Sequence, residues 1–366
     1  MAVLSATALL VTASQAFGAA DPLKGGTTDL ALKLPGKVKL GVKGGATKSG
    51  KSVTLPITGG SLDPTNGSGP VQDGGSIVLK AKKKVKLTNI IVTFGPGGSI
   101  SAKVKGKKTK LAKVTGGTAG RAGFGGTVTG ALAKLTKKGA SALNKALGLS
   151  KGGFKNGKKL SSASTTTVPS TVAVTSATSS TTLDVSDILS GCVPSGTCNT
   201  YAGKLTEDGI SSTPSNGASI VGFPPVVTFT PQTGGSMALD CAGGTLTGSQ
   251  GAVTLARGMA SITQANPNDD FAGKVVTFEA SASTVGSLGR ASATNLIVTP
   301  GTCAADPTTK TITVTATQTV NPLAATVANN VLGLDGSPCG PGGPPQDCAL
   351  AGGDPVGTTT YTIHTQ

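Results

Sequence analysis

The sequence predicts a mainly β protein, built from antiparallel β-sandwich or barrel-like domains with one short amphipathic helix. Three observations predict this class. Val, Ile and Leu alternate with polar residues in many short runs, as in half-buried strands. The chain holds 55 Gly and 21 Pro, which mark frequent turns. Aromatic residues make up only 3% of the chain, so aliphatic side chains have to form the cores.

The first twenty residues predict export. Ala2 to Ala13 is an almost continuous run of apolar and small residues, too short to span a bilayer. Small residues at 16–18 and 18–20 match a cleavage site, so residues 1–20 are expected to be a signal peptide. No Lys or Arg precedes the run, and a buried strand is the alternative. No later apolar stretch reaches eighteen residues, so we expect no transmembrane segment and an extracellular or cell-surface location.

Charge divides the chain into two halves. Residues 21–160 hold 26 Lys and one Arg against four Asp, a net +23. Residues 161–366 hold three Lys and two Arg against twelve acidic residues, a net −7. This asymmetry predicts a Lys-rich domain over 21–160 and a Cys-containing domain over 181–366. The Ser/Thr-rich segment 161–180 between them is either a linker or a connecting strand.

The front half is expected to form a series of strands closed by a helix. Thr136 can cap a helix over Lys137 to Leu147, and Gly148 can end it. Residues 21–34 are expected to be a leading segment, and 59–69 a turn-rich loop. The strands are expected at 37–43, 51–57, 76–81, 85–94, 100–104 and 110–114.

The back half is expected to form further strands, and three short matches suggest that it is a diverged second copy. Thr58 to Leu62 resembles Thr233 to Met237, and 88–93 resembles 294–299. The segment 323–334 resembles 140–149, which includes most of the predicted helix. Such matches in a common order indicate duplication. The strands are expected at 226–230, 236–240, 252–256, 275–280, 293–299, 309–317 and 358–364.

All six cysteines lie in the back half. An even number in an exported chain predicts disulfides, and six cysteines allow 15 pairings. Proximity in sequence favours Cys192–Cys198 and Cys339–Cys348, which leaves Cys241–Cys303. Metal binding is the alternative, but the sequence has no CxxC pair and a single His.

The front half resembles the HtaA domain family. The likeness covers about residues 30–160 and is carried by SVTLPITGGSLDPTNGSGPVQDGGSIVLKA (52–81), VKLTNIIVTF (85–94) and VTGALAKLTKKGASALNKALG (128–148). The resemblance implies an actinobacterial secreted or surface domain associated with haem transport. It also implies a Tyr ligand to haem iron with His residues nearby.

The front half contains no Tyr and no His, so no haem ligand can be assigned within it. We therefore expect no cofactor from the residues, and haem by resemblance only. Haem iron needs an axial donor. The back half offers Tyr201, Tyr361 and His364 as weak candidates.

No residue set in the sequence predicts catalysis, so we expect no enzyme. His364 is the single His, and no Ser/His/Asp set or phosphate-binding loop can be recognised. The oxygen-rich segment Asn266 to Asp270 could bind Ca²⁺, but an ordinary turn is the simpler interpretation. We expect no metal site.

The densest lysine runs alternate with apolar residues and predict a basic sheet face. Such a face can hold anions in a salt-sensitive manner, but lysines on strands also simply prevent edge pairing. The leading hypothesis is a non-enzymatic envelope protein that binds an anionic cell-wall polymer or a surface protein; haem or iron acquisition is the alternative. No aromatic residues interleave the lysines, so sequence-specific nucleic-acid binding is not expected. The oligomeric state stays open. The residues of the expected face are Lys80, Lys82, Lys83, Lys84, Lys86, Lys103, Lys105, Lys107, Lys108 and Lys110.

Overall fold

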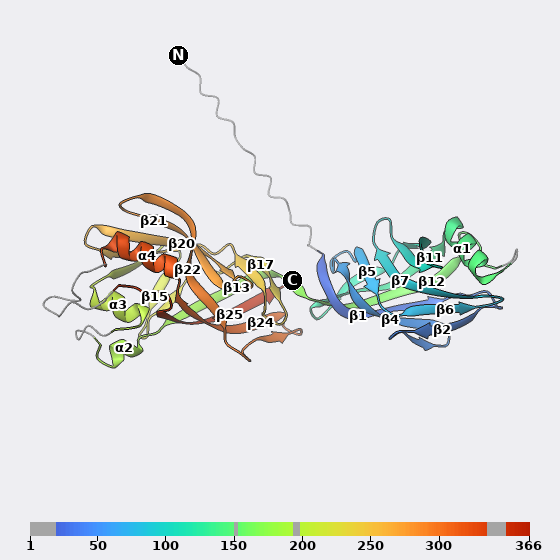
Figure 1. Ribbon diagram of the computed structural model, residues 1–366, viewed down its shortest axis with the longest axis horizontal. Helices are drawn as coiled ribbons and strands as arrows, with labels where there is room; N and C mark the ends of the chain where they lie inside the picture. The colour runs from blue at the N-terminus through green and yellow to red at the C-terminus, as the bar shows by residue number, and fades with distance from the viewer. Residues whose placement is uncertain (1–19, 150–152, 193–197, 335–348) are drawn as a thin grey trace, which may run out of the picture.

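The computed structural model describes residues 20–149, 153–192, 198–334 and 349–366. The chain forms two β lobes that lie end to end (Figure 1). We call residues 20–169 the front lobe and the described residues from 171 onward the back lobe. The mainly antiparallel, barrel-like class expected from the sequence is confirmed. Apart from Ala20, the expected signal peptide lies outside the described residues.

The front lobe holds one helix, α1 (Lys137–Leu147), with Thr136 as its N-cap and Gly148 as its C-cap, so the predicted helix is confirmed. Its strands are β1 (Asp21–Leu32), β2 (Lys39–Lys43), β3 (Thr47–Ser49), β4 (Ser52–Leu62), β5 (Gly69–Asp73), β6 (Ser76–Lys80), β7 (Lys84–Phe94), β8 (Ser99–Val104), β9 (Lys107–Thr115), β10 (Thr118–Ala122), β11 (Gly125–Leu135) and β12 (Lys159–Pro169).

The back lobe holds three helices, α2 (Ser186–Leu189), α3 (Tyr201–Glu207) and α4 (Pro322–Leu332), among its described residues. Its strands are β13 (Thr171–Leu183), β14 (Ser211–Ser215), β15 (Ser219–Val221), β16 (Val226–Thr228), β17 (Gly234–Ala238), β18 (Gly244–Thr247), β19 (Ala252–Arg257), β20 (Ala260–Asp270), β21 (Val275–Ala282), β22 (Gly286–Val298), β23 (Ala304–Asp306), β24 (Thr311–Val320) and β25 (Pro355–Thr365).

Each lobe closes a ring of eight paired strands, and the two rings have the same strand order. The front ring runs β7-β5-β4-β1-β12-β11-β9-β8 and returns to β7. The back ring runs β20-β18-β17-β13-β25-β24-β22-β21 and returns to β20. In both lobes the long helix lies between the last two ring strands along the chain. The two lobes therefore share one topology.

The repeated Thr-Gly-Gly-Ser motif occupies equivalent places in the two rings, on β4 and β17. Its second glycine has φ +107 at Gly60 and φ +112 at Gly235. A Cβ at either position would lie 2.1 or 2.0 Å from a carbonyl oxygen of the paired strand. Only glycine tolerates this conformation and this close approach, which explains why the motif is present in both lobes.

The two long helices also match in detail. Asn144 of α1 exchanges two hydrogen bonds of 2.8 Å with the backbone of Phe154. Asn329 of α4 exchanges two of 2.9 Å with the backbone of Leu350. The match between 88–93 and 294–299 fails, because 88–93 lies in β7 and 294–299 begins in β22, and these strands hold different positions in their rings.

Segment 161–180 consists of strands and contains no flexible linker. β12 belongs to the front sheet and β13 to the back sheet, and Ser170 alone separates them. The leading segment 21–34 also differs from expectation: most of it is β1, which pairs with both β4 and β12. Its composition is poor in strand formers, so pairing on both sides rather than intrinsic propensity makes it a strand.

Candidate functional site: a cavity in the back lobe

The back ring encloses a cavity of about 360 Å³, within the range of small-molecule sites. Strands of the ring form its walls, and α2, α3 and α4 contribute to its lining. Phe223 lines the cavity and is 65% exposed, so the cavity opens to solvent beside β15 and β16. Most of the lining is apolar, and the apolar residues include Leu183, Val185, Leu205, Ile210, Ile220, Phe229, Leu255, Phe278, Ala328 and Val356.

Helix α3 is held at the cavity by contacts at both ends. Thr200 caps it by accepting a hydrogen bond of 3.0 Å from the Gly203 amide. Asp187 in turn accepts one of 2.6 Å from the Thr200 amide. Lys204 donates a 2.9 Å hydrogen bond to the Ala349 carbonyl and forms a 3.0 Å ion pair with Asp354. These contacts fix the orientation of the first helical residue, Tyr201.

The disulfide Cys192–Cys198 closes the α2–α3 connection, and Cys241–Cys303 closes a longer loop. Both pairings were favoured by the sequence and are confirmed. Cys339 and Cys348 lie outside the described residues. Disulfides of this kind are typical of proteins that fold in oxidising compartments. None of the helices in the described ranges is long and apolar enough to cross a membrane.

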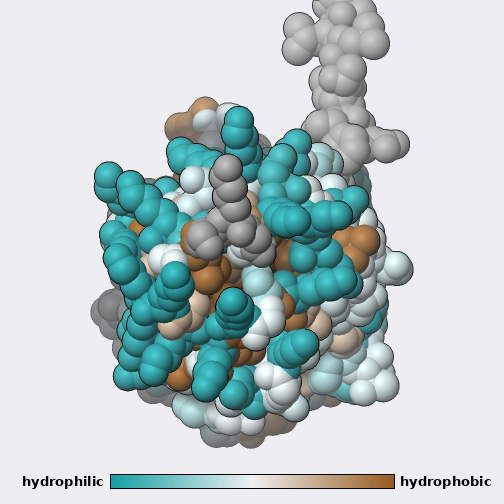
Figure 2. Space-filling view, turned by 90° about the vertical axis from the view of Figure 1, so that its right-hand side faces the viewer, coloured by the Kyte–Doolittle hydropathy of each residue, from teal (hydrophilic) through white to brown (hydrophobic). Residues whose placement is uncertain are grey.

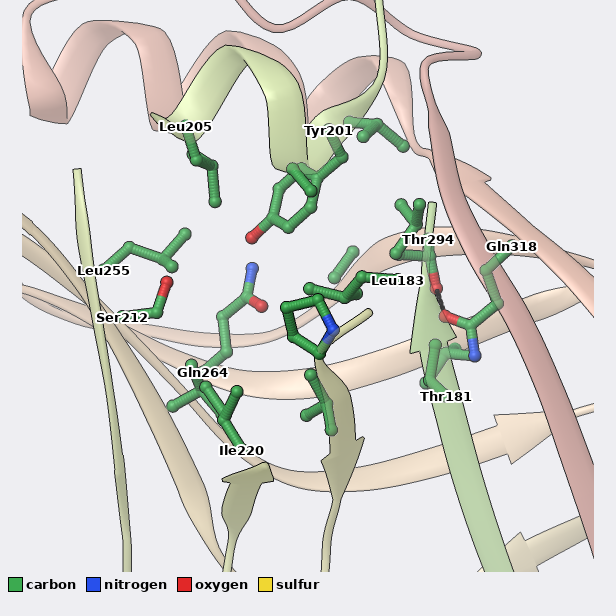
Figure 3. A pocket seen from close by; sticks show the side chains of 18 of the residues that line it. Thr181, Leu183, Tyr201, Leu205, Ser212, Ile220, Leu255, Gln264, Thr294 and Gln318 are labelled. Atoms are coloured by element: carbon green, nitrogen blue, oxygen red, sulfur yellow. Dashed lines mark hydrogen bonds between the residues drawn. The ribbon is translucent and has the colours of Figure 1, made fainter. Parts of the chain in front are cut away.

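Tyr201 projects from α3 into the cavity, where its hydroxyl faces the Gln264 amide of β20 (Figure 3). Ser212 of β14 lies on the same side. Among the described residues, the Tyr201 hydroxyl has no hydrogen-bond partner. Burial raises the pKa of Tyr201 well above its usual value, and the described lining of the cavity holds no basic side chain that would lower it. The hydroxyl is therefore a neutral, unpaired donor inside an apolar space.

The opposite wall carries polar groups that already satisfy one another. The Thr294 hydroxyl donates to Gln318 Oε1 at 2.8 Å, and Gln318 Nε2 donates to the Thr359 hydroxyl at 2.7 Å. The Thr359 hydroxyl shares a 2.8 Å hydrogen bond with that of Thr181. Because these groups bond to each other, the polar side chains of the cavity without a hydrogen-bond partner among the described residues are those of Tyr201, Gln264, Ser212 and Ser179.

Tyr361 also borders the cavity, but its hydroxyl is engaged. It donates to Asp269 Oδ1 at 2.7 Å, and Gln232 Nε2 donates to Asp269 Oδ2 at 2.6 Å. Burial raises the pKa of Asp269 to about 6, and the hydrogen bond from Tyr361 lowers it only in part. His364 lies on the exposed side of β25 and does not line the cavity. Of the three candidate ligands, Tyr201 alone places a hydroxyl without a hydrogen-bond partner among the described residues inside the cavity.

The expected oxygen-rich loop at 266–270 is wrong, because these residues belong to β20. Asp269 is bound as described, and Asp270 accepts a hydrogen bond from the Gly273 amide. No group of three or more potential metal ligands occurs within the described ranges. All ten lysines of the expected basic face are exposed on or beside β6 to β9 of the front lobe, far along the chain from the cavity.

The sequence did not indicate Gln264, Ser212 or helix α3. A helix start at Thr200 followed by a stop at Gly209 was readable as a capping pattern. Ser212 lies in the five-residue strand β14 and Gln264 in the middle of β20, and no pattern in the sequence relates the two positions. Gln264 and Ser212 come close to Tyr201 only when the strands of the back ring close into a barrel.

No family model matches the chain, and no curated protein matches it. Three solved structures from Corynebacterium glutamicum resemble it. The C-terminal domain of HtaA is 14% identical, with a TM-score of 0.32, covering 40% of this chain and 98% of that one. The N-terminal domain of HtaA is 13% identical, with a TM-score of 0.33, covering 40% and 99%. The haem-binding protein HtaB is 14% identical, with a TM-score of 0.32, covering 54% and 96%. The likeness is distant, so the residues of the cavity have to support any function.

Proposed function

We propose that this protein is a non-enzymatic binding protein whose back lobe holds an apolar, haem-type ligand against Tyr201. The observation that carries the proposal is the unpaired Tyr201 hydroxyl inside the apolar cavity. The hydroxyl of the partly buried Tyr201 faces the cavity, so a ligand held there could form a bond that the described residues do not supply. The two disulfides support placing this function outside the cytosol.

The residues of the cavity fit haem in two respects. Tyr is one of the side chains that hold haem iron, and the walls are apolar. A metal cation also lowers the pKa of a group that burial alone raises, so the neutral phenol of the free protein does not oppose ligation. Among the described residues no Lys, Arg or His lines the cavity, so haem propionates would have to point to solvent, at the opening beside Phe223.

Haemin titration of the purified chain tests the proposal. We expect a shift of the Soret band, and a loss of affinity of about tenfold or more in Tyr201→Phe, which removes only the donor oxygen. Tyr361→Phe is the matched control, because the Tyr361 hydroxyl already bonds to Asp269 and should leave the titration unchanged. His364→Ala should also leave it unchanged. An absent shift, or a shift that survives Tyr201→Phe, would overturn the assignment of Tyr201.

A second candidate function belongs to the front lobe, where the basic face could retain the protein on anionic polymers of the cell envelope. The observation that favours it is that the positive charges of this face are not neutralised by carboxylates: none of the ion pairs among the described residues involves a lysine of this face. Charges left without partners remain available to an anionic ligand. A surface protein with an acidic patch would use the same chemistry.

A further inference from the structure

Two neighbouring hairpins bring the lysines of the basic face together. One hairpin joins β6 to β7, and the other joins β8 to β9. β7 pairs with β8 through Leu87 opposite Val104 and Thr88 opposite Lys103, so the two hairpins lie side by side. The expected lysine runs at 80–86 and 103–110 therefore form one surface, although about twenty residues separate them in sequence.

The strand register places lysines directly opposite one another. Lys39 of β2 faces Lys80, and Lys80 faces Lys84, which makes a row of three lysines across three strands. Lys103 faces Lys108 in the same way. Neighbouring strands lie about 4.8 Å apart, and like charges directly opposite each other are destabilising. The front lobe thus keeps an arrangement that weakens the free protein.

No carboxylate of the front lobe neutralises the positive charge of these lysine rows. The front lobe has four acidic residues, of which Asp21, Asp63 and Asp73 are buried. The fourth, Asp29, is exposed on β1, which lies four strands from β8 in either direction around the ring. The lysine rows and the exposed carboxylate are therefore on opposite sides of the barrel.

Helix α1 extends the basic surface. The Lys83 amide donates a 3.0 Å hydrogen bond to the carbonyl of Leu147, the last residue of the helix. Lys145 lies in the last helical turn, and Lys82 lies against the capping Gly148. Seen end-on, many hydrophilic side chains project from this end of the front lobe, with hydrophobic surface between them (Figure 2). The cations therefore surround one end of the molecule rather than a single strand.

We infer that this surface, which we call the lysine rows (Lys39, Lys80, Lys84, Lys103 and Lys108), binds a linear polyphosphate-type polymer, a chain with repeated phosphate groups. The inference rests on the basic face being a binding surface. Evenly spaced point charges suit a flexible chain that places one phosphate after another near them. A lysine ammonium is a point charge and, unlike the guanidinium of arginine, imposes no bidentate geometry on its ligand. The surface should therefore select a polymer by its charge density and not by the identity of nucleic-acid bases. No exposed aromatic residue interleaves the rows, which disfavours nucleic acid.

Binding of long-chain inorganic polyphosphate to the full chain tests the inference, with orthophosphate and polyglutamate as comparisons. We expect binding to polyphosphate that weakens steeply with salt, and no measurable binding to orthophosphate. The variant Lys80→Gln/Lys84→Gln/Lys103→Gln/Lys108→Gln should lose about tenfold or more in affinity. The matched control Lys24→Gln/Lys33→Gln/Lys51→Gln/Lys274→Gln removes the same charge from exposed lysines elsewhere and should change affinity by less than about twofold.

Four outcomes separate the inference from the broader proposal. Failure to bind polyphosphate and also purified cell wall at low salt would overturn the basic face as a binding surface. Equal or tighter binding of polyglutamate would keep the basic face and overturn the preference for phosphate. Tighter binding of single-stranded DNA than of polyphosphate of equal charge would overturn the choice of polymer. Equal losses in the two quadruple variants would show that net charge, not the rows, is responsible.

Discussion

The two lobes share one topology, but one barrel is filled and the other is hollow. The corresponding space in the front lobe is only about 20 Å³, lined by aliphatic side chains that include Leu30, Ile77, Leu79 and Leu143. The back lobe encloses about 360 Å³ with the same eight-strand ring. The fold therefore does not decide whether this protein has a ligand site. The volume and polarity of a few inward side chains decide it.

The long helices show how the difference arises. Counting back from the capping glycines, Leu143 of α1 corresponds to Ala328 of α4. Leu143 is 1% exposed and fills the front core, whereas Ala328 lines the cavity. The shared hydrogen bonds of Asn144 and Asn329 hold the two helices in the same way. A change of side-chain volume at one position thus accompanies the change from core to cavity.

The largest expected effect comes from emptying the filled lobe. Leu143→Ala should destabilise the front lobe by about 2–5 kcal/mol, because it leaves a cavity in a packed core. Hydrogen-exchange mass spectrometry resolves the two lobes and should show faster exchange in β6 to β9 with little change in the back lobe. Leu132→Ala is the control, since Leu132 is 40% exposed. Similar losses in the two variants would contradict the view that Leu143 closes the front core.

The buried carboxylates provide a second contrast between the lobes. Asp269 is held by Tyr361 and Gln232, whereas neither oxygen of Asp73 has a hydrogen-bond partner. Burial raises the pKa of Asp73 to about 7, which the nearby Thr28 hydroxyl opposes only in part. Since the folded pKa lies above the unfolded value, this group favours folding most at low pH, and its contribution is lost as pH rises through about 7.

Asp73→Asn should remove this dependence. Front-lobe stability of the unsubstituted protein should fall by on the order of 4 kcal/mol between about pH 4 and pH 7 because of Asp73, and the variant should lose that part of the slope. Asp21, whose pKa burial raises to about 6, accounts for a remaining slope. Denaturant unfolding of the unsubstituted protein and of Asp73→Asn across this pH range measures how the free energy of unfolding depends on pH. The exposed Asp29→Asn variant should keep the slope, and an unchanged slope in Asp73→Asn would refute the assignment.

We expect the smallest change in stability from a substitution that fills the back-lobe cavity. The same substitution should have a large effect on haemin binding. Ala328→Leu restores the side chain found at the front-lobe position and should change stability by less than about 1.5 kcal/mol, because it fills empty space. It should also reduce haemin affinity, measured by the Soret titration used for Tyr201. Ala146→Leu on α1 is a contrasting variant, since it overpacks the filled core and should destabilise the front lobe. Unchanged haemin binding in Ala328→Leu would place the ligand elsewhere.

Local features of the fold were predictable from the sequence where local chemistry decides them. The caps of α1 at Thr136 and Gly148 were predicted at the residues where they occur. The alternating runs predicted β7 and β24 closely. β1 was not predictable, because its Gly- and Thr-rich sequence becomes a strand only between β4 and β12. The same holds for Asn266 to Asp270, where turn-forming residues lie within a paired strand.

The sequence by itself indicated the all-β class, the basic front half and the two described disulfides. It also limited the candidate haem ligands to Tyr201, Tyr361 and His364. Only the tertiary structure decided that the Tyr361 hydroxyl has a hydrogen-bond partner while that of Tyr201 has none among the described residues, and that lysines of separate strands lie opposite each other. The physical reason is the same in each case. Composition and capping act within a few residues along the chain. Empty volume, unpaired hydroxyls and cross-strand charge depend on distances between segments that meet only when the rings close.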